Sequence, residues 1–537
     1  MSCDNGLKYI KSASNSLFTC GEINNILENS SDIKHALKNF QTSYYIIKKN
    51  SNISLVPFKD IDKDGADLEC IGVIPEFLPE DLGSRSFKEN YNLKYAYMAG
   101  SMANEISSVD MVIALGKKGF LCSFGAGGVD INKIEKAIID IKRELPNGPY
   151  CFNLIHNPYE PYIEKQTIDL YLKHNITLIE ASAFINLSPS LVYYRVSGLS
   201  KDNQGNVVIK NKVIAKVSRP QIAKRFLEPP SQKFLKKLLN EGLITEEQAE
   251  LAAKLPVADD ITVESDSGGH TDNRPLLSIF TVIKDLKNEI QAKYNYDKEI
   301  RIGVGGGIST PHSALAAFSI GADYVVTGSV NQACVEAGTS DFVRKLLATA
   351  GVSDMAMAPA ADMFEMGAKV QVLKKGTLYP LRAQKLYDIY TKYNSVDEIP
   401  IDEKEKIENS FFQKTIDEVW QDTVDFFMKR DPDHIKRAQE DPKKKMALIF
   451  RWYLGLSPYW ARVACDERKM DYQIWCGPSM GAFNDWVKGS ELEKPENRFV
   501  GDIALRLMKG AAYLERLNSL KVLGVESGSY YNFYEID

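Results

Sequence analysis

From Tyr95 onward, short apolar strands alternate with helical stretches eight times, and this alternation limits the folds that the chain can adopt. The segments with strand character are 95–98, 120–124, 150–154, 177–181, 213–217, 260–263, 301–304 and 324–327. The clearest helical stretches are 105–117, 132–143, 162–174, 276–293, 311–320 and 341–350. Eight β units, most of them followed by a helix, predict an α/β protein with a closed (β/α)8 barrel, and an open doubly wound sheet is the alternative.

Two segments interrupt the alternation. Residues 202–211 carry Gln-Gly-Asn between β-prone residues, which predicts a hairpin. Residues 231–255 have helical spacing and no apolar strand. We therefore expect a helical insertion, at about 228–256, after the fifth β unit.

The chain has 537 residues, more than one hydrophobic core usually organises, so further regions are expected around the barrel. We expect a small mixed N-terminal region at 1–90, the barrel at 91–355, and a mostly helical C-terminal region at 356–537. Within the first region, strands are expected in 41–56 and 68–74, with a turn at 49–52.

The C-terminal region is rich in aromatic residues from Leu381 onward. Aromatic burial in a helical core is the plainer interpretation. The functional interpretation is a cap over the barrel mouth that shapes a long apolar substrate channel. Residues 354–367, rich in Met and Ala, predict a loop and a helix close to that mouth.

The composition of the chain argues against several classes of protein. The net charge is −5, from 66 basic and 71 acidic residues, which disfavours a nucleic-acid-binding protein. None of the eight cysteines forms a C-x-x-C pair, so disulfide and zinc frameworks are poorly supported and a reducing cytoplasm fits. The polar N-terminus and the absence of an apolar run of about 18 residues predict neither a signal peptide nor a membrane span.

Glycine-rich segments close the seventh and eighth strands. The seventh runs into Gly305, Gly306 and Gly307, and the eighth into Gly328 and Ser329. Loops at these two places in such barrels often bind phosphate, because glycines let backbone N–H groups approach the oxygens. The spacing is not that of the G-x-G-x-x-G dinucleotide fingerprint. We expect a site for one phosphate; a pair of tight turns without a ligand is the alternative.

Other strands are closed or followed by residues that could take part in catalysis or bind a ligand. Gly268, Gly269 and His270 follow the sixth strand, and histidine is an acid or base near neutral pH, although a lone histidine is more often structural. Lys216 interrupts the apolar fifth strand, so it either faces a ligand inside the barrel or extends outward between helices. Asn153 closes the third strand and is a candidate hydrogen-bond donor. Ala99, Gly100 and Ser101 close the first strand and would let a flat ligand lie against the backbone.

These residues carry a resemblance to a known superfamily. The stretch from Asp266 to His270, together with Asn153 and the two glycine loops, resembles the hallmark of the nitronate monooxygenase and FMN-dependent enoyl reductase superfamily. Three longer strings, 213–220, 264–275 and 477–486, are more similar to its PfaD-like branch. That branch includes the trans-acting enoyl reductases of polyketide synthases and the PfaD reductase of polyunsaturated fatty acid synthases.

The sequence also departs from the wider superfamily. Val263 and Glu264 stand where classical nitronate monooxygenases often carry Gln and Gly. The long C-terminal helical region is foreign to those enzymes as well. Both differences weaken the interpretation as a nitronate monooxygenase.

The resemblance implies an FMN-binding TIM barrel that takes electrons from NADPH. Such an enzyme would reduce the α,β double bond of an enoyl thioester on an acyl carrier protein. Polyketide or fatty acid synthase modules are the implied partners, and a second copy of the chain in a homo-oligomer is a further candidate. His270 would supply a proton or hold the thioester oxygen, and Lys216 would stabilise the reduced flavin. The flavin would be held by Ala99, Gly100, Ser101, Asn153, Lys216, Gly268, Gly269, Gly305, Gly306, Gly307, Gly328 and Ser329. A nitronate monooxygenase-type flavin oxidase and a non-catalytic scaffold are the alternatives.

Overall fold

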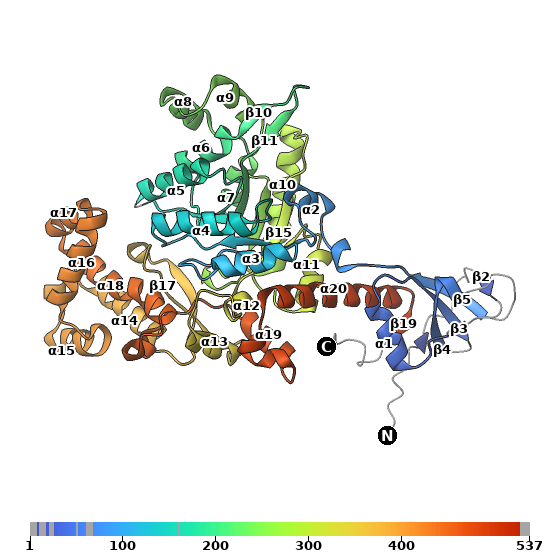
Figure 1. Ribbon diagram of the computed structural model, residues 1–537. Coiled ribbons are helices and arrows are strands. Elements are labelled where there is room, and N and C mark those ends of the chain that lie inside the picture. Colours follow the sequence, from blue (N-terminus) through green and yellow to red (C-terminus); the bar gives the residue numbers. More distant parts are fainter. Residues whose placement is uncertain are drawn as a thin grey trace.

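The computed structural model describes residues 8–9, 18–20, 26–49, 52–60, 68–158 and 160–526 of the chain. Its centre is a closed barrel of eight parallel strands, as the sequence predicts (Figure 1). The strands are β6 (Tyr97–Ala99), β7 (Leu121–Phe124), β8 (Cys151–Ile155), β9 (Leu178–Ser182), β12 (Lys212–Val217), β13 (Asp260–Glu264), β15 (Arg301–Gly305) and β16 (Val325–Thr327). Each overlaps one of the eight predicted segments, so the open doubly wound alternative is wrong.

Helices surround the barrel strands. They are α3 (Val109–Lys117), α4 (Ile131–Glu144), α5 (Pro161–Lys173), α6 (Pro189–Ser197), α7 (Pro220–Leu227), α10 (Leu276–Tyr294), α11 (Pro311–Ser319), α12 (Ser329–Gln332) and α13 (Asp341–Ala348). The predicted hairpin is formed by β10 (Leu199–Lys201) and β11 (Val207–Ile209), and the predicted insertion by α8 (Gln232–Asn240) and α9 (Glu246–Ala252). Both interruptions of the alternation are therefore confirmed.

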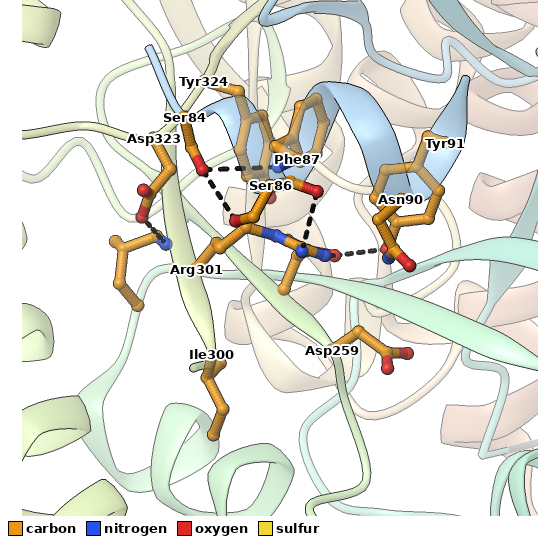
Figure 2. Close-up of polar contacts among 12 residues, drawn as sticks. Ser84, Ser86, Phe87, Asn90, Tyr91, Asp259, Ile300, Arg301, Asp323 and Tyr324 are labelled. Carbon is orange, nitrogen blue, oxygen red and sulfur yellow. Dashed lines mark hydrogen bonds and ion pairs between the residues drawn. The ribbon is translucent and has the colours of Figure 1, made fainter. Parts of the chain in front are cut away.

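Helix α2 (Arg85–Tyr91) closes the N-terminal end of the barrel (Figure 2). The ring of Phe87 stacks on that of Tyr324, with centroids 4.1 Å apart. Arg301 and the fully buried Asp260 form an ion pair there, with Nη2 of the arginine 2.9 Å from Oδ2 of the aspartate. In the part of the chain that the structure describes, side chains fill this end, so a ligand would enter the barrel from the opposite end.

A second sheet contains both termini of the described chain. Its order is β19-β1-β4-β3-β5-β2, and it lies beside the barrel at the end of α20 (Figure 1). The strands are β1 (Lys8–Tyr9), β2 (Phe18–Cys20), β3 (Tyr44–Lys49), β4 (Asn52–Pro57), β5 (Leu68–Ile74) and β19 (Val525–Glu526), with α1 (Ser30–Lys38) against them. The strands predicted in 41–56 and 68–74 are confirmed; the predicted turn at 49–52 lies partly outside the described residues.

A three-stranded sheet stands at the barrel mouth, in the order β14-β18-β17. Its strands are β14 (Gly269–His270), β17 (Met355–Pro359) and β18 (Lys369–Leu373). The expected loop and helix at 354–367 are therefore wrong: the segment begins with a strand, and only the 3-10 turn Phe364–Met366 is helical. The antiparallel pairing with β18, which begins ten residues after β17 ends, decides this conformation.

The rest of the C-terminal region is helical, as predicted. It comprises α14 (Tyr379–Lys392), α15 (Ile401–Lys406), α16 (Ile416–Arg430), α17 (Asp433–Glu440), α18 (Pro442–Arg462), α19 (Ser479–Val487) and α20 (Val500–Val522). Helix α20 does not cap the mouth, because it packs on α3 and α11 outside the barrel and reaches the terminal sheet (Figure 1). Among the described residues, no helix is long and apolar enough to cross a membrane.

Candidate active site

A cavity of about 1390 Å³ opens at the C-terminal ends of the barrel strands. Residues at or just after the ends of all eight strands line it, and the helices α16 and α18 form its outer wall. Pockets for a single small ligand usually measure about 300–1,000 Å³. The cavity therefore has room for a cofactor together with part of a second molecule.

The structure brings nearly all predicted site residues to this cavity. The lining includes Gly100, Ser101, Asn153, Lys216, Gly268, Gly269, His270, Gly305, Gly306, Gly307, Gly328 and Ser329. Ala99 is the exception: its buried side chain packs in the core between strands and helices, facing away from the barrel interior. Strand side chains alternate between faces, so Gly100 and not Ala99 turns inward.

Lys216 faces the interior of the barrel, in the inward register predicted for it. Its Nζ lies 3.1 Å from Oε1 of Glu264 at the end of the neighbouring strand β13. Burial disfavours the charged ammonium, but the carboxylates of Glu264 and Glu180 outweigh burial and raise the pKa of Lys216. The lysine is therefore a permanent cation at the bottom of the cavity, and it is already paired.

Glu180 is the carboxylate that the sequence analysis missed. It is fully buried on β9, and its Oε2 accepts a hydrogen bond of 2.9 Å from the backbone N–H of Ser101. Its Oε1 has no hydrogen-bond partner in the described part of the chain. Asn153 donates to the Glu180 carbonyl at 3.2 Å and to Ser182 at 3.1 Å. An unsatisfied buried acceptor is costly, so a donor from a bound ligand would stabilise the site.

His270 is held at the mouth by the three-stranded sheet. Strand β14 pairs with β18, and Nε2 of His270 lies 3.0 Å from Oδ1 of Asp362, which follows β17. Burial works against a charged ring, but the hydrogen bond to Asp362 and its charge outweigh burial and raise the pKa of His270 above its usual value. The same contact lowers the pKa of Asp362. The contact with Asp362 therefore favours the protonated form of the ring.

The predicted glycines differ in what surrounds them. A Cβ added to Gly307 or Gly328 would meet no heavy atom within 4 Å. One added to Gly306 would lie 2.5 Å from Oγ of Ser265, and one added to Gly268 would lie 2.9 Å from the backbone of Cys476. Gly306 and Gly268 are thus required by packing of the chain itself, whereas Gly307 and Gly328 border open space.

A second histidine, also missed from the sequence, lines the cavity. His156 directly follows β8, and its Nδ1 lies 3.0 Å from Oε2 of the buried Glu164 on α5. The signal was present, because His156 follows the third barrel strand even more closely than His270 follows the sixth. Its carboxylate partner lies eight residues further on.

The outer wall belongs to the C-terminal helices. Phe427, Arg451 and Trp452 are among its lining residues. Arg430 at the end of α16 forms an ion pair with Glu160 before α5, with Nε 2.7 Å from Oε1, and so ties the helices to the barrel. This wall lines the outer part of the cavity with aromatic and cationic side chains.

Comparisons with known proteins agree with this architecture. Residues 393–472 match the family described as acyl-carrier-protein S-malonyltransferase, inserted helical domain. The match begins directly after α14 and ends ten residues after α18. The crystal structure of the enoyl reductase domain of MlnA, from the macrolactin biosynthesis cluster of Bacillus amyloliquefaciens, is 45% identical. It superposes with a TM-score of 0.79 and covers 82% of this chain and 100% of that chain.

The chain belongs to the family of PfaD-like enoyl reductases. A subunit of the polyunsaturated fatty acid synthase of Thraustochytrium is 49% identical over 448 residues, 82% of this chain. Polyketide biosynthesis protein PksE of Bacillus subtilis is 46% identical over 444 residues, also 82% of this chain. The chain spans 30% and 58% of the length of these two curated relatives.

Proposed function

We propose that this PfaD-like chain is an FMN-dependent enoyl reductase that uses NADPH to saturate the α,β double bond of an enoyl thioester carried by an acyl carrier protein. The proposal rests on the cavity at the barrel mouth. This cavity is lined by the two glycine loops (305–307 and 328–329), by Lys216 and His270, and by a wall of C-terminal helices. Its polyketide or fatty acid synthase context is inferred from the family.

The residues present fit FMN. Gly307 and Gly328 border open space, and in the described part of the chain their backbone N–H groups have no hydrogen-bond acceptor, as a phosphate site requires. The unpaired Oε1 of Glu180 is an acceptor for a ring N–H, which an isoalloxazine carries. Lys216 supplies positive charge on the same side of the barrel. When bound, FMN supplies hydride transfer from NADPH to the substrate.

The chain's own residues would then manage binding and charge. The two glycine loops would hold the phosphate. The side chains that fill the N-terminal end of the barrel would keep solvent from reaching the cavity through that end. His270, whose protonated form is favoured by Asp362, would donate a hydrogen bond to the thioester oxygen, where negative charge develops as hydride arrives at the β-carbon. The outer part of the cavity, lined by the C-terminal helices, would take the pantetheine arm.

The test begins with the visible spectrum of the purified protein. We expect a yellow protein whose flavin absorbance is bleached by NADPH under anaerobic conditions and restored by crotonyl-pantetheine. A free enoic acid should restore it poorly. Colourless protein that also binds no added FMN would indicate a scaffold, and faster turnover of alkyl nitronates with oxygen would indicate an oxidase.

A further inference from the structure

His156 and Glu164 form an imidazole–carboxylate pair inside the cavity wall. His156 stands at the same end of the barrel as Lys216 and His270 and lines the same cavity. The exposed fractions of the two side chains are 10% for His156 and 2% for Glu164. The pair is therefore shielded from bulk water while the ring borders the cavity.

The surroundings fix the orientation of the His156 ring. The second carboxylate oxygen of Glu164 accepts a hydrogen bond from the hydroxyl of Ser188, the N-cap residue of α6. The ring stacks on Phe184, with centroids 4.7 Å apart and 18° between the planes. Since Nδ1 is taken by Glu164, the other ring nitrogen, which has no hydrogen-bond partner in the described part of the chain, is the one left for a ligand.

A buried carboxylate is costly unless a charge or strong donor compensates it. Among the described residues, the carboxylate of Glu164 contacts two polar groups: the ring of His156 and the neutral hydroxyl of Ser188. Of these two, His156 is the one that can carry a compensating charge. The carboxylate holds Nδ1 of the ring and so leaves Nε2 as the nitrogen that can exchange a proton with a ligand in the cavity. That is the arrangement of a positioned proton donor.

We propose that His156 delivers the proton to the α-carbon of the enoyl thioester and that Glu164 positions it. This inference rests on the enoyl reductase function proposed above. Hydride adds to the β-carbon, the π electrons of the double bond move toward the α-carbon, and a C–H bond forms there as the Nε2–H bond of His156 breaks. The imidazolium becomes neutral imidazole and recovers its proton from water before the next turnover, so one hydride and one proton saturate the double bond.

Burial favours His156 over His270 as this donor. The His270 side chain is 37% exposed and its partner Asp362 is 56% exposed, against 10% and 2% for His156 and Glu164. A donor shielded from water transfers its proton to one face of the α-carbon, whereas an exposed one competes with solvent. Electrostatic stabilisation by the carboxylate is also stronger where the effective dielectric is lower.

The experiment separates proton delivery from hydride transfer. Wild type and His156→Gln are reduced anaerobically with NADPH and mixed with crotonyl-pantetheine in D₂O, and the configuration of the deuterated C2 of the butyryl product is determined. For the wild type we expect one configuration. For His156→Gln we expect reoxidation of the flavin to slow by about 10²–10⁴-fold and the residual product to lose its single configuration. Flavin content and reduction by NADPH should match the wild type.

Two further variants test the role of the pair. Glu164→Gln keeps the shape and a hydrogen bond but removes the charge, so it should lower kcat for the thioester while leaving its KM unchanged. His174→Gln is the matched control, because Nε2 of His174 pairs with Glu135 at 2.7 Å and neither residue lines the cavity. The control should keep wild-type rates and a single product configuration.

The outcomes distinguish the inference from the proposed function. Wild-type reoxidation and a single C2 configuration in His156→Gln would overturn the inference, and so would an equal fall in flavin content and both half-reactions. If the wild type itself is not reoxidised by crotonyl-pantetheine, the proposed function fails instead.

Discussion

Gly328 offers the sharpest test of the phosphate site, through the substitution Gly328→Val. Gly328 follows β16, lines the cavity, has a φ of −136°, and would direct an added Cβ into space with no heavy atom within 4 Å. The Cβ should therefore displace no part of the protein, and the isopropyl group should extend from it into the cavity. We expect a folded protein with a blocked phosphate site.

The size of the effect follows from the hydrogen bonds lost. A hydrogen bond to a charged group contributes about 1.5–3 kcal/mol. Losing two of them from backbone N–H groups to the phosphate would cost about 3–6 kcal/mol, which weakens FMN binding by about 10²–10⁴-fold. Riboflavin has no phosphate, so its affinity should fall much less. The preference for FMN over riboflavin should therefore largely disappear.

The assay is titration of the apoprotein with each flavin, followed by quenching of flavin fluorescence, with thermal unfolding of the apoprotein as the folding check. Gly455→Val is the matched control, because Gly455 lies on α18, lines the cavity and also has open space around an added Cβ. It should retain FMN. Gly306 is unsuitable, because a side chain there would collide with Ser265. Wild-type FMN affinity in Gly328→Val would refute the phosphate assignment.

Three further substitutions address charge and stability. Lys216→Met should lower the flavin midpoint potential by about 20–65 mV. The substitution removes ~1–3 kcal/mol of charge stabilisation, and a two-electron couple shifts by ~30 mV per 1.4 kcal/mol. An unchanged potential in a spectroelectrochemical titration would show that the ammonium does not act on the ring. Asp362→Asn should lower the pKa of His270, which this contact raises, so the alkaline limb of the pH profile for thioester turnover should move to lower pH; an unmoved limb would mean that His270 is not the titrating group. Arg301→Met should lower the free energy of unfolding in urea by about 3–5 kcal/mol, because it leaves the Asp260 carboxylate buried without its cation, and FMN affinity should stay unchanged. A loss below about 1 kcal/mol would contradict the importance of that pair.

The barrel was predictable because its signals are local. Each strand is a short apolar run between helical stretches, and segment 301–304 differs from β15 (Arg301–Gly305) by a single residue. The sheet at the mouth was not predictable in this way. Met355–Pro359 has no β-branched residue, and only its pairing with Lys369–Leu373 makes it a strand.

The same distinction applies to the site. Residues that close barrel strands, such as His270 and Asn153, could be read from the sequence because the fold places all strand ends on one cavity. The partner of His270 could not, because Asp362 lies in the connection between β17 and β18, and β17 carries no local strand signal. Glu180 could have been found by the signal that identified Lys216, because it too is a charged residue inside an otherwise apolar strand.

Strand register shows what that oversight changes. Neighbouring residues in parallel strands share a face, and β12 pairs Ile214 with Glu180 of β9 and Lys216 with Thr262 of β13. With the two-residue period of a strand, Glu180, Lys216 and Glu264 therefore all point into the barrel. The group consists of one cation and two carboxylates, so Lys216 does not present an isolated positive charge to a bound ring. It neutralises charge that would otherwise oppose reduction, and its removal should lower the potential for that reason as well as through the loss of direct attraction.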